Sequence, residues 1–313
     1  RNSFWDGDLP ERWFDNESET PNIGYFGNGA RGPGGSGSNT IFKTDFTAET
    51  ITELPATLSS SKYYRAFFQS GTAGYWTGGY PWQPGKGAAC GSMYKQIGNS
   101  GSPTAGYVMG GSTGIGAPER AAYANDVMNK ITFATDTRSA LPGVIDHGTG
   151  HSPQKNMMDG GSGTSGTVGY WFWGEDGGFY RSFVEKSVWS TDTFSVLTET
   201  IPNSPIISFS TASTNTFSML MGGNGSPSPR TTCMKFTYST ETMSTPTGQL
   251  LTGTINSGYQ SNGAAGWISG GGTPGFGITN MQKYTFSTDT VTDISNMRYP
   301  NPGVWLHKAG VGP

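Results

Sequence analysis

Two short patterns recur along this chain, and their spacing restricts the fold more than any other feature of the sequence. The first is a small residue, an aromatic or Met, two further residues and a Gly, with copies beginning at residues 24, 74, 106, 169, 218 and 266. The second is a hydrophobic strand followed by Ser/Thr-Asp-Thr or a close variant, at 41, 131, 187, 235 and 284. Where both are clear, they advance together by about 48 to 56 residues, which predicts an architecture built from repeated units.

Each unit is predicted to contain four short β-strands. The "GYWTGG" type of segment forms one strand, whose paired glycines permit positive φ or close backbone approach. A second strand ends where Asp and Thr favour a tight turn. Segments such as "FSVLTETIP" give the third strand, and "KYYRAFFQS" or "SPIISFS" the strand that leads to the next unit. No window shows the period of an amphipathic helix, so the chain is expected to be all-β.

Repeated four-stranded units of this length are typical of a β-propeller. We expect one propeller of six blades, with five or seven as alternatives, because the region between Asp45 and Asp136 holds an additional blade with a shortened outer half. The C-terminal "NPGVWLHKAGVGP" is expected to complete the N-terminal blade, which would make Trp305 and Leu306 structural. Residues 1–22 are then an extension that packs on the ring, and 23–313 are the propeller.

These segments resemble kelch-type propeller repeats, and are most similar to the divergent kelch-like repeats of marine phage tail-associated and metagenomic proteins. The resemblance covers residues 23 to 311. The outer-strand Trp of typical kelch repeats is replaced here by aliphatic residues, namely Leu54, Leu141, Val196 and Ile294. The resemblance therefore implies a binding platform, but not the cytosolic ubiquitin-ligase adaptor role of many kelch proteins.

Composition narrows the class of protein. The chain has 33% hydrophobic and 13% charged residues, but its 17 Phe, 14 Tyr and 9 Trp argue against disorder. A net charge of -3 without a basic cluster disfavours nucleic-acid binding, and no apolar run is long enough to insert in a membrane. A targeting segment is expected to be absent or already removed. Few charges and many Ser and Thr suit an extracellular, secreted protein or a virion surface.

The two cysteines, Cys90 and Cys233, fit neither a redox pair nor a zinc set. They are expected to be two free buried thiols or, alternatively, one long-range disulfide that brings two repeats together.

Candidate ligand-binding residues come from loops that a propeller would place on one face. These are Tyr80, Trp82, Asp146, His147, Asp176, Phe179, Tyr180, Arg181 and Tyr299. Flat aromatic rings among polar side chains suit stacking on sugar rings or anchoring a protein partner. The alternative is that these aromatics cap the interfaces between blades.

Catalytic and metal-binding patterns are weaker. His147 and His151 are a candidate metal pair, but Gly148 and Gly150 place them in a loop, where the spacing fixes no geometry. The recurring acids, Asp45, Asp136, Asp192, Glu241 and Asp289, lack the Gly of a sialidase Asp-box and are interpreted as turn residues. We expect no cofactor and assign no catalytic residue.

Three functions follow from this sequence. The first is a non-enzymatic recognition or adhesion protein that binds a glycan or protein receptor through one propeller face. The second is a hydrolase or lyase with a site at the channel mouth, and the third is a structural subunit of an extracellular or virion assembly. A homo-oligomer or a larger assembly is compatible with each.

Overall fold

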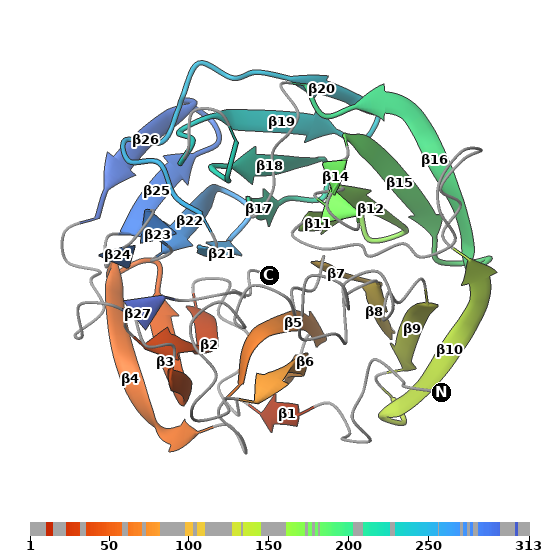
Figure 1. Cartoon of the computed structure of the whole chain (residues 1–313), viewed down its shortest axis with the longest axis horizontal. Helices are drawn as coiled ribbons and strands as arrows, with labels where there is room; N and C mark the ends of the chain where they lie inside the picture. Colours follow the sequence, from red (N-terminus) through yellow and green to blue (C-terminus); the bar gives the residue numbers. More distant parts are fainter. Residues whose placement is uncertain are drawn as a thin grey trace.

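The computed structural model describes residues 11–14, 23–31, 36–57, 62–70, 73–81, 98–102, 105–109, 127–132, 134–144, 161–172, 175–176, 179–180, 182–202, 209–225, 229–255, 257–269, 272–273, 276–277, 281–294 and 304–305. Within these ranges the protein is all-β and contains no helix, as the sequence predicted. Most of the strands belong to antiparallel sheets of three or four strands, which we number sheet 1 to sheet 6 (Figure 1).

The first three sheets are formed mainly by the N-terminal half of the chain. In spatial order, sheet 1 contains β27 (Val304–Trp305), β2 (Ile23–Arg31), β3 (Ser36–Asp45) and β4 (Thr50–Thr57). Sheet 2 contains β5 (Lys62–Ser70), β6 (Ala73–Pro81) and β1 (Glu11–Phe14). Sheet 3 contains β7 (Gly98–Ser102), β8 (Ala105–Met109), β9 (Val127–Thr132) and β10 (Thr137–Val144).

The C-terminal half of the chain forms the other three sheets in the same way. Sheet 4 contains β11 (Gly161–Thr164), β12 (Val168–Phe172), β15 (Phe183–Val188) and β16 (Thr193–Thr200). Sheet 5 contains β17 (Ser210–Ser213), β18 (Phe217–Met221), β19 (Cys233–Thr237) and β20 (Thr242–Ser244). Sheet 6 contains β21 (Gly258–Ser261), β22 (Ala265–Ser269), β25 (Met281–Thr285) and β26 (Thr290–Asp293). In spatial order, the aromatic-glycine segments are the second strands of all six sheets.

The six sheets lie side by side around a common centre (Figure 1). Strands β5, β7, β11, β17 and β21 lie nearest this centre, and β4, β10, β16, β20 and β26 lie at the periphery (Figure 1). Contacts between sheets follow the chain order, from β2 to β5, β7, β11, β17 and β21, and then from β21 back to β2. The last sheet therefore contacts the first.

Sheet 1 joins the two ends of the described chain. Strand β27 pairs antiparallel with β2, with Trp305 opposite Ala30 and Val304 opposite Arg31. This pairing confirms the prediction that the C-terminal segment completes the N-terminal sheet, although Leu306 lies outside the described residues. Sheets 6 and 1 are also joined by a 2.6 Å ion pair between Lys283 Nζ and Glu49 Oε1.

Sheet 2 takes its third strand from the N-terminal region. Strand β1 pairs antiparallel with β6, with Glu11 opposite Trp76 and Phe14 opposite Ala73. In the other sheets the strand in this position follows the aromatic-glycine strand in sequence. The sequence did predict a blade with a shortened outer half in this region, but not that a segment from within residues 1–22 would be one of its strands.

Deletion of residues 1–14 is expected to destabilise sheet 2. The deletion removes the ladder hydrogen bonds between β1 and β6, each contributing about 0.5–1.5 kcal/mol, so we expect a loss of about 2 kcal/mol. In the deletion variant, amide hydrogen exchange should be faster in β6 than in β12, because β12 keeps partner strands on both sides in sheet 4. Unchanged protection of β6 would show that β1 contributes nothing to this sheet.

Apolar side chains pack between sheets 4 and 5, between sheets 5 and 6, and between sheets 6 and 1. Between sheets 4 and 5, Tyr170 stacks on Tyr238 with ring centroids 4.8 Å apart and lies 5.0 Å from Phe236. Between sheets 6 and 1, Trp267 stacks on Phe46 at 4.1 Å. The aromatic residue of the repeated motif thus faces the next sheet, and its role at these positions is in the fold.

The small residue before this aromatic allows neighbouring sheets to approach. A Cβ added to Gly163 of β11 would lie 1.9 Å from Ser218 Oγ of β18. At the next interface, a Cβ added to Gly266 of β22 would lie 2.7 Å from the Cβ of Ala212 in β17. Ser218 and Gly266 are equivalent positions of the motif, and a larger side chain at either would collide with the preceding sheet.

The recurring acids occupy the turns between the third and fourth strands. Asp136, Asp192, Glu241 and Asp289 all have φ between 50° and 52°, a left-handed conformation that Asp adopts more readily than most residues. Their interpretation as turn residues is confirmed. In sheet 1 the left-handed position is held by Glu49, with φ 51°. Asp45 is also a turn residue, because its Oδ1 accepts hydrogen bonds from the amides of Thr47 and Ala48.

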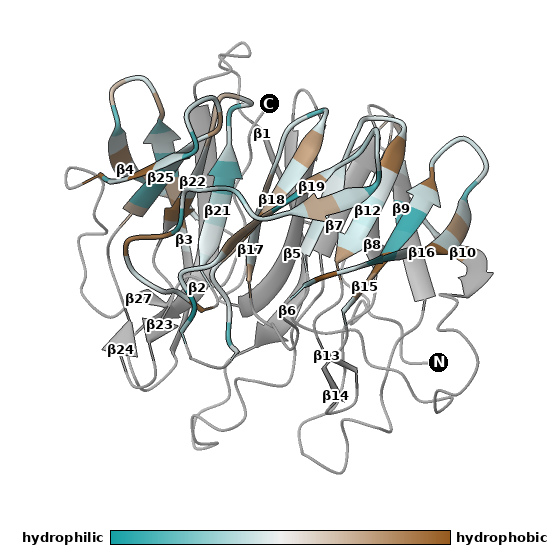
Figure 2. Ribbon diagram, turned by 90° about the horizontal axis from the view of Figure 1, so that it is seen from above, coloured by the Kyte–Doolittle hydropathy of each residue, from teal (hydrophilic) through white to brown (hydrophobic). Residues whose placement is uncertain are grey.

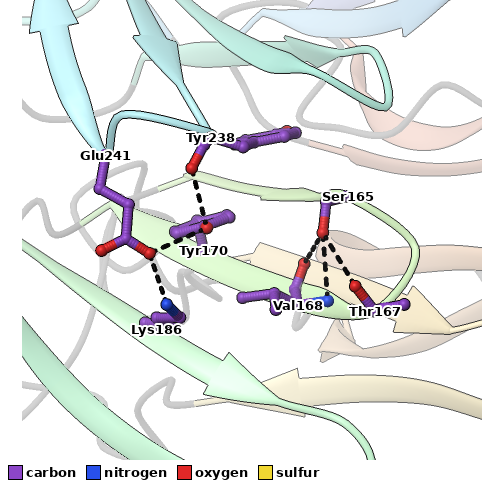
Figure 3. Close-up of polar contacts among 7 residues, drawn as sticks. All are labelled: Ser165, Thr167, Val168, Tyr170, Lys186, Tyr238 and Glu241. Atoms are coloured by element: carbon purple, nitrogen blue, oxygen red, sulfur yellow. Dashed lines mark hydrogen bonds and ion pairs between the residues drawn. The ribbon is translucent and has the colours of Figure 1, made fainter.

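Three of these acids, Glu49, Asp192 and Glu241, also bind the preceding sheet. Glu241 Oε1 accepts a hydrogen bond from Tyr170 Oη at 3.2 Å and forms an ion pair with Lys186 Nζ at 2.5 Å (Figure 3). Asp192 Oδ2 pairs with Lys130 Nζ at 3.0 Å across the interface of sheets 3 and 4. Because both partners are partly exposed, each ion pair stabilises the fold by at most about 1 kcal/mol.

Candidate ligand-binding face

One side of the molecule carries two small hairpins that add to the sheets. β13 (Glu175–Asp176) and β14 (Phe179–Tyr180) lie between β12 and β15 of sheet 4, and β23 (Gly272–Thr273) and β24 (Phe276–Gly277) lie between β22 and β25 of sheet 6. In an antiparallel sheet, the connection between the second and third strands lies at the opposite end from the turn between the third and fourth strands. The turn from β9 to β10 is of the latter kind and lies at the upper side of the view in Figure 2, so both hairpins belong to the lower side. We call the lower side the hairpin face.

The paired glycines of the motif position the loops of this face in sheet 5. Gly222 and Gly223 have φ of 70° and 103°, and a Cβ added to Gly222 would lie 2.7 Å from Thr254 O. The amide of Gly223 donates to the same oxygen at 2.7 Å. The loop after β18 therefore contacts the connection from β20 to β21, as expected for loops that emerge on one face.

A group of buried hydroxyls fixes this connection further. Ser257 Oγ lies 3.0 Å from both Ser210 Oγ and Thr254 Oγ1. Ser210 Oγ also donates to Ser257 O at 3.0 Å. Because the Ser257 hydroxyl is bonded to both of the others, the group holds the first strands of sheets 5 and 6 at the start of the face.

The structure brings three predicted site residues together in one hairpin. Asp176 pairs with Phe179, and Tyr180 pairs with Glu175, in the β13–β14 ladder. Tyr80 lies near the end of β6, opposite Tyr63, in sheet 2. Sheet 3 lies between sheets 2 and 4 in the order of contacts, so Tyr80 belongs to a different part of the ring. The other candidates, Trp82, Asp146, His147, His151, Arg181 and Tyr299, lie outside the described residues.

Sequence analysis missed Phe276, which is the counterpart of Phe179 in the second hairpin. Phe276 pairs with Thr273 as Phe179 pairs with Asp176. The signal was available, because "DGGF" and "TPGF" both place a Phe directly after a turn of Gly or Pro-Gly. Sheets 4 and 6 therefore each present one Phe-bearing hairpin on the hairpin face.

Two buried ionisable groups lie in the core of sheet 5. Cys233 is a free, fully buried thiol; Cys90 is outside the described residues. Burial raises the pKa of Cys233 to about 12, and the charge of Asp289 adds to this rise. Burial likewise raises the pKa of Tyr238 to about 12, although hydrogen bonds with Ser218 and Ser213 lower it in part. Both groups are neutral at physiological pH.

The Tyr238→Phe variant is expected to reduce the loss of stability at alkaline pH. Unfolding returns the pKa of Tyr238 from about 12 to its ordinary value of 10.0, so the unfolded chain releases this proton first and stability falls as pH rises through this window. Near pH 11 the hydroxyl should account for about 1 kcal/mol of that loss. Urea unfolding at pH 8 and near pH 11 measures it, with the exposed Thr191→Ala variant as the control. An identical pH dependence in wild type and Tyr238→Phe would contradict the assignment.

Two further findings concern the described residues alone. No group of three or more His, Cys, Asp or Glu side chains there is arranged to hold a metal ion. Nor does that part of the chain contain a helix long and apolar enough to cross a membrane.

Comparison with known proteins shows a similarity of fold. No protein-family description matches the chain, and no curated protein matches it in sequence. Among solved structures, it is similar to one described as "Structure of YjhT", with a TM-score of 0.51 and 16% sequence identity over 68% of each chain. At this identity the similarity concerns the fold alone.

Proposed function

We propose that the six sheets are the blades of one closed β-propeller. Support comes from the contacts that run from β2 through the sheets and back to β2, and from the pairing of β27 with β2. The clusters of buried apolar residues between sheets 4 and 5, 5 and 6, and 6 and 1 fit this arrangement, because a blade buries both of its faces against its neighbours.

We further propose that this propeller is a non-enzymatic recognition protein that binds a glycan or a protein receptor through the hairpin face. The observation that carries this proposal is the β13–β14 hairpin, which adds Asp176, Phe179 and Tyr180 to a sheet that is already complete without them. Insertions that leave the scaffold intact are a common place for binding residues. An aromatic ring next to a carboxylate suits sugar binding, because the ring stacks on C–H groups and the carboxylate accepts hydrogen bonds from hydroxyls.

The opposite side of the sheets supports this choice of face. The described turns there, with their acids at positive φ, bind the neighbouring sheet through Lys186 and Lys130, so their charged groups already have partners. The low charge and the many Ser and Thr of the chain fit a location outside the cell or on a virion surface. Glycans and surface receptors are the ligands available there.

Screening the purified protein on a glycan array tests the proposal. The double variant Phe179→Ala/Tyr180→Ala should weaken binding at least tenfold, since loss of an aromatic contact residue costs about 2 kcal/mol or more. The matched control is Val196→Ala, which truncates an exposed residue of the outer strand β16. Far-UV circular dichroism should show that both variants are folded.

Three results would count against this function. Glycan binding that survives the double hairpin variant would place the site elsewhere. Absence of binding to any glycan, together with failure to bind intact cells, would favour a structural subunit of an assembly. Turnover of an oligosaccharide by the wild type would favour the hydrolase or lyase alternative instead.

A further inference from the structure

The interface between sheets 6 and 1 contains buried polar atoms without hydrogen-bond partners. They are Oε1 and Nε2 of Gln260, Nε1 of Trp267 and Oγ1 of Thr44, and none has a partner in the part of the chain that the structure describes. The exposed fractions of these residues are 0%, 1% and 0%. An unpaired buried polar group costs about 1–3 kcal/mol, so four such atoms in one interface require an explanation.

All three side chains lie on the surfaces that meet at this interface. Trp267 faces sheet 1, because its ring stacks on Phe46. Gln260 is directly opposite Trp267 in the β21–β22 ladder, and opposite residues of an antiparallel pair project from the same face of the sheet. Thr44 lies two residues from Phe42 within β3, so both project from the same face of sheet 1. Phe42 packs in one cluster with Trp267, so this face is the one that meets sheet 6.

The equivalent positions at two other interfaces are apolar or small. Where sheet 6 has Gln260, sheets 4 and 5 have Gly163 and Ala212, each opposite the motif residue Tyr170 or Met219. Where sheet 1 has Thr44, sheets 5 and 6 have the aromatic residues Phe236 and Tyr284. The interface of sheets 6 and 1 therefore replaces an aromatic ring by a hydroxyl and adds a primary amide.

We propose that this interface is a binding site for internal water, held by the Gln260 amide, Trp267 Nε1 and Thr44 Oγ1. In this group, Gln260 Nε2 and Trp267 Nε1 are hydrogen-bond donors and Gln260 Oε1 is an acceptor. The Thr44 hydroxyl can donate or accept. Internal waters typically make about three hydrogen bonds to such groups. Thr44 is smaller than Phe236 and Tyr284 at the equivalent positions, which favours space for a water molecule. The water joins the last sheet to the first, independently of any ligand on the hairpin face.

A high-resolution crystal structure of the unmodified protein tests the proposal directly. The expected result is water density within about 2.7–3.2 Å of the Gln260 amide and of at least one of the other two groups. A dry interface, or a Gln260 amide that is bonded to protein groups alone, would overturn it.

Stability of the Gln260→Leu variant gives a second test. Loss of the hydrated amide should lower the folding equilibrium constant about tenfold. If the amide were instead dry and unpaired, the same substitution would remove two unpaired atoms and raise this constant, which would also overturn the proposal. Gln282→Leu is the matched control, because Gln282 Oε1 accepts from the amides of Leu251 and Thr252 and its Nε2 donates to Thr252 O. That control should be destabilised whether or not water is bound.

Discussion

Replacement of Trp267 by alanine is expected to destabilise the protein by about 3–5 kcal/mol, the usual cost of removing a fully buried aromatic side chain from a core. The Trp267 side chain is 1% exposed and its ring stacks on Phe46 of sheet 1 at 4.1 Å. It packs in one cluster with Phe42, Met281 and Ile294. This substitution therefore removes the largest side chain from the interface that joins the last sheet to the first. Urea unfolding, followed by fluorescence and by circular dichroism, measures the loss.

A double-mutant cycle shows whether Trp267 stabilises the protein through its contact with Phe46 across the interface. Trp267→Ala and Phe46→Ala should be coupled by about 0.5–1.5 kcal/mol, because stacked aromatic rings contribute about this much beyond burial. The control substitution, Thr288→Ala, changes an exposed turn residue of the same sheet and should cost less than about 0.5 kcal/mol. Strict additivity of the two core substitutions would mean that the rings do not contact one another in solution.

The second large effect is expected for Gly163. The Gly163→Ala variant should lose about 2–3 kcal/mol, because its Cβ would lie 1.9 Å from Ser218 Oγ and 2.5 Å from Tyr238 Oη. It would also separate these two oxygens, which share a 2.7 Å hydrogen bond. Gly166→Ala is the control, because that position has φ of 89° but open space around it, so only the backbone cost of about 1 kcal/mol applies.

The interface between sheets 5 and 6 indicates how the stability lost in Gly163→Ala can be regained. There, Ala212 takes the place of Gly163, Gly266 the place of Ser218, and Phe286 the place of Tyr238. Adding Ser218→Gly and Tyr238→Phe to the Gly163→Ala variant copies this set into the interface of sheets 4 and 5. The triple variant should regain at least half of the lost stability. A loss that is additive over the three substitutions would show that the contact between sheets is not the cause.

The strands and turns of this protein were predictable because they depend on local sequence. The motif beginning at Gly169 became β12, and "KYYRAFFQS" became β5 with the same bounds. The acid of each turn was found correctly where a Thr follows and an aromatic precedes by three residues, as at Asp192. The turn of sheet 1 contains two acids. Asp45 was predicted and accepts two hydrogen bonds from backbone amides of the turn, whereas Glu49, which holds the left-handed position directly before Thr50, was not predicted.

The contribution of the N-terminal segment was not predictable. Residues 11–14 have no counterpart in the repeat, and "ERWF" is too short to identify a partner strand by its pattern. Strand β1 lies beside β6 at the position where, in the other five sheets, a strand that follows in sequence is found. Such pairings depend on what the rest of the chain leaves unpaired, and not on local preference.

Side-chain contacts between sheets could not be predicted from the sequence either. The repeat predicted that a small residue precedes each aromatic, but not that Gly163 and Ser218 share the limited space between two sheets. It did not distinguish Gln260 from its apolar equivalents. Of the candidate site, the Asp176, Phe179 and Tyr180 group was found because turn chemistry marks the hairpin, whereas Phe276 was overlooked because no charged residue accompanies it.

Cross-linking of the two ends of the chain tests the ring most directly. Arg31 and Val304 are opposite one another in the β2–β27 ladder, and opposite residues of an antiparallel pair lie close enough for a disulfide. The Arg31→Cys/Val304→Cys variant, in a Cys90→Ser background, should form this disulfide within a single chain on mild oxidation, as identified by peptide mass spectrometry. The Arg31→Cys/Thr242→Cys control, with its second cysteine in sheet 5, should not. Failure of residues 31 and 304 to cross-link, or cross-linking only between chains, would contradict a ring in which the last strand joins the first sheet.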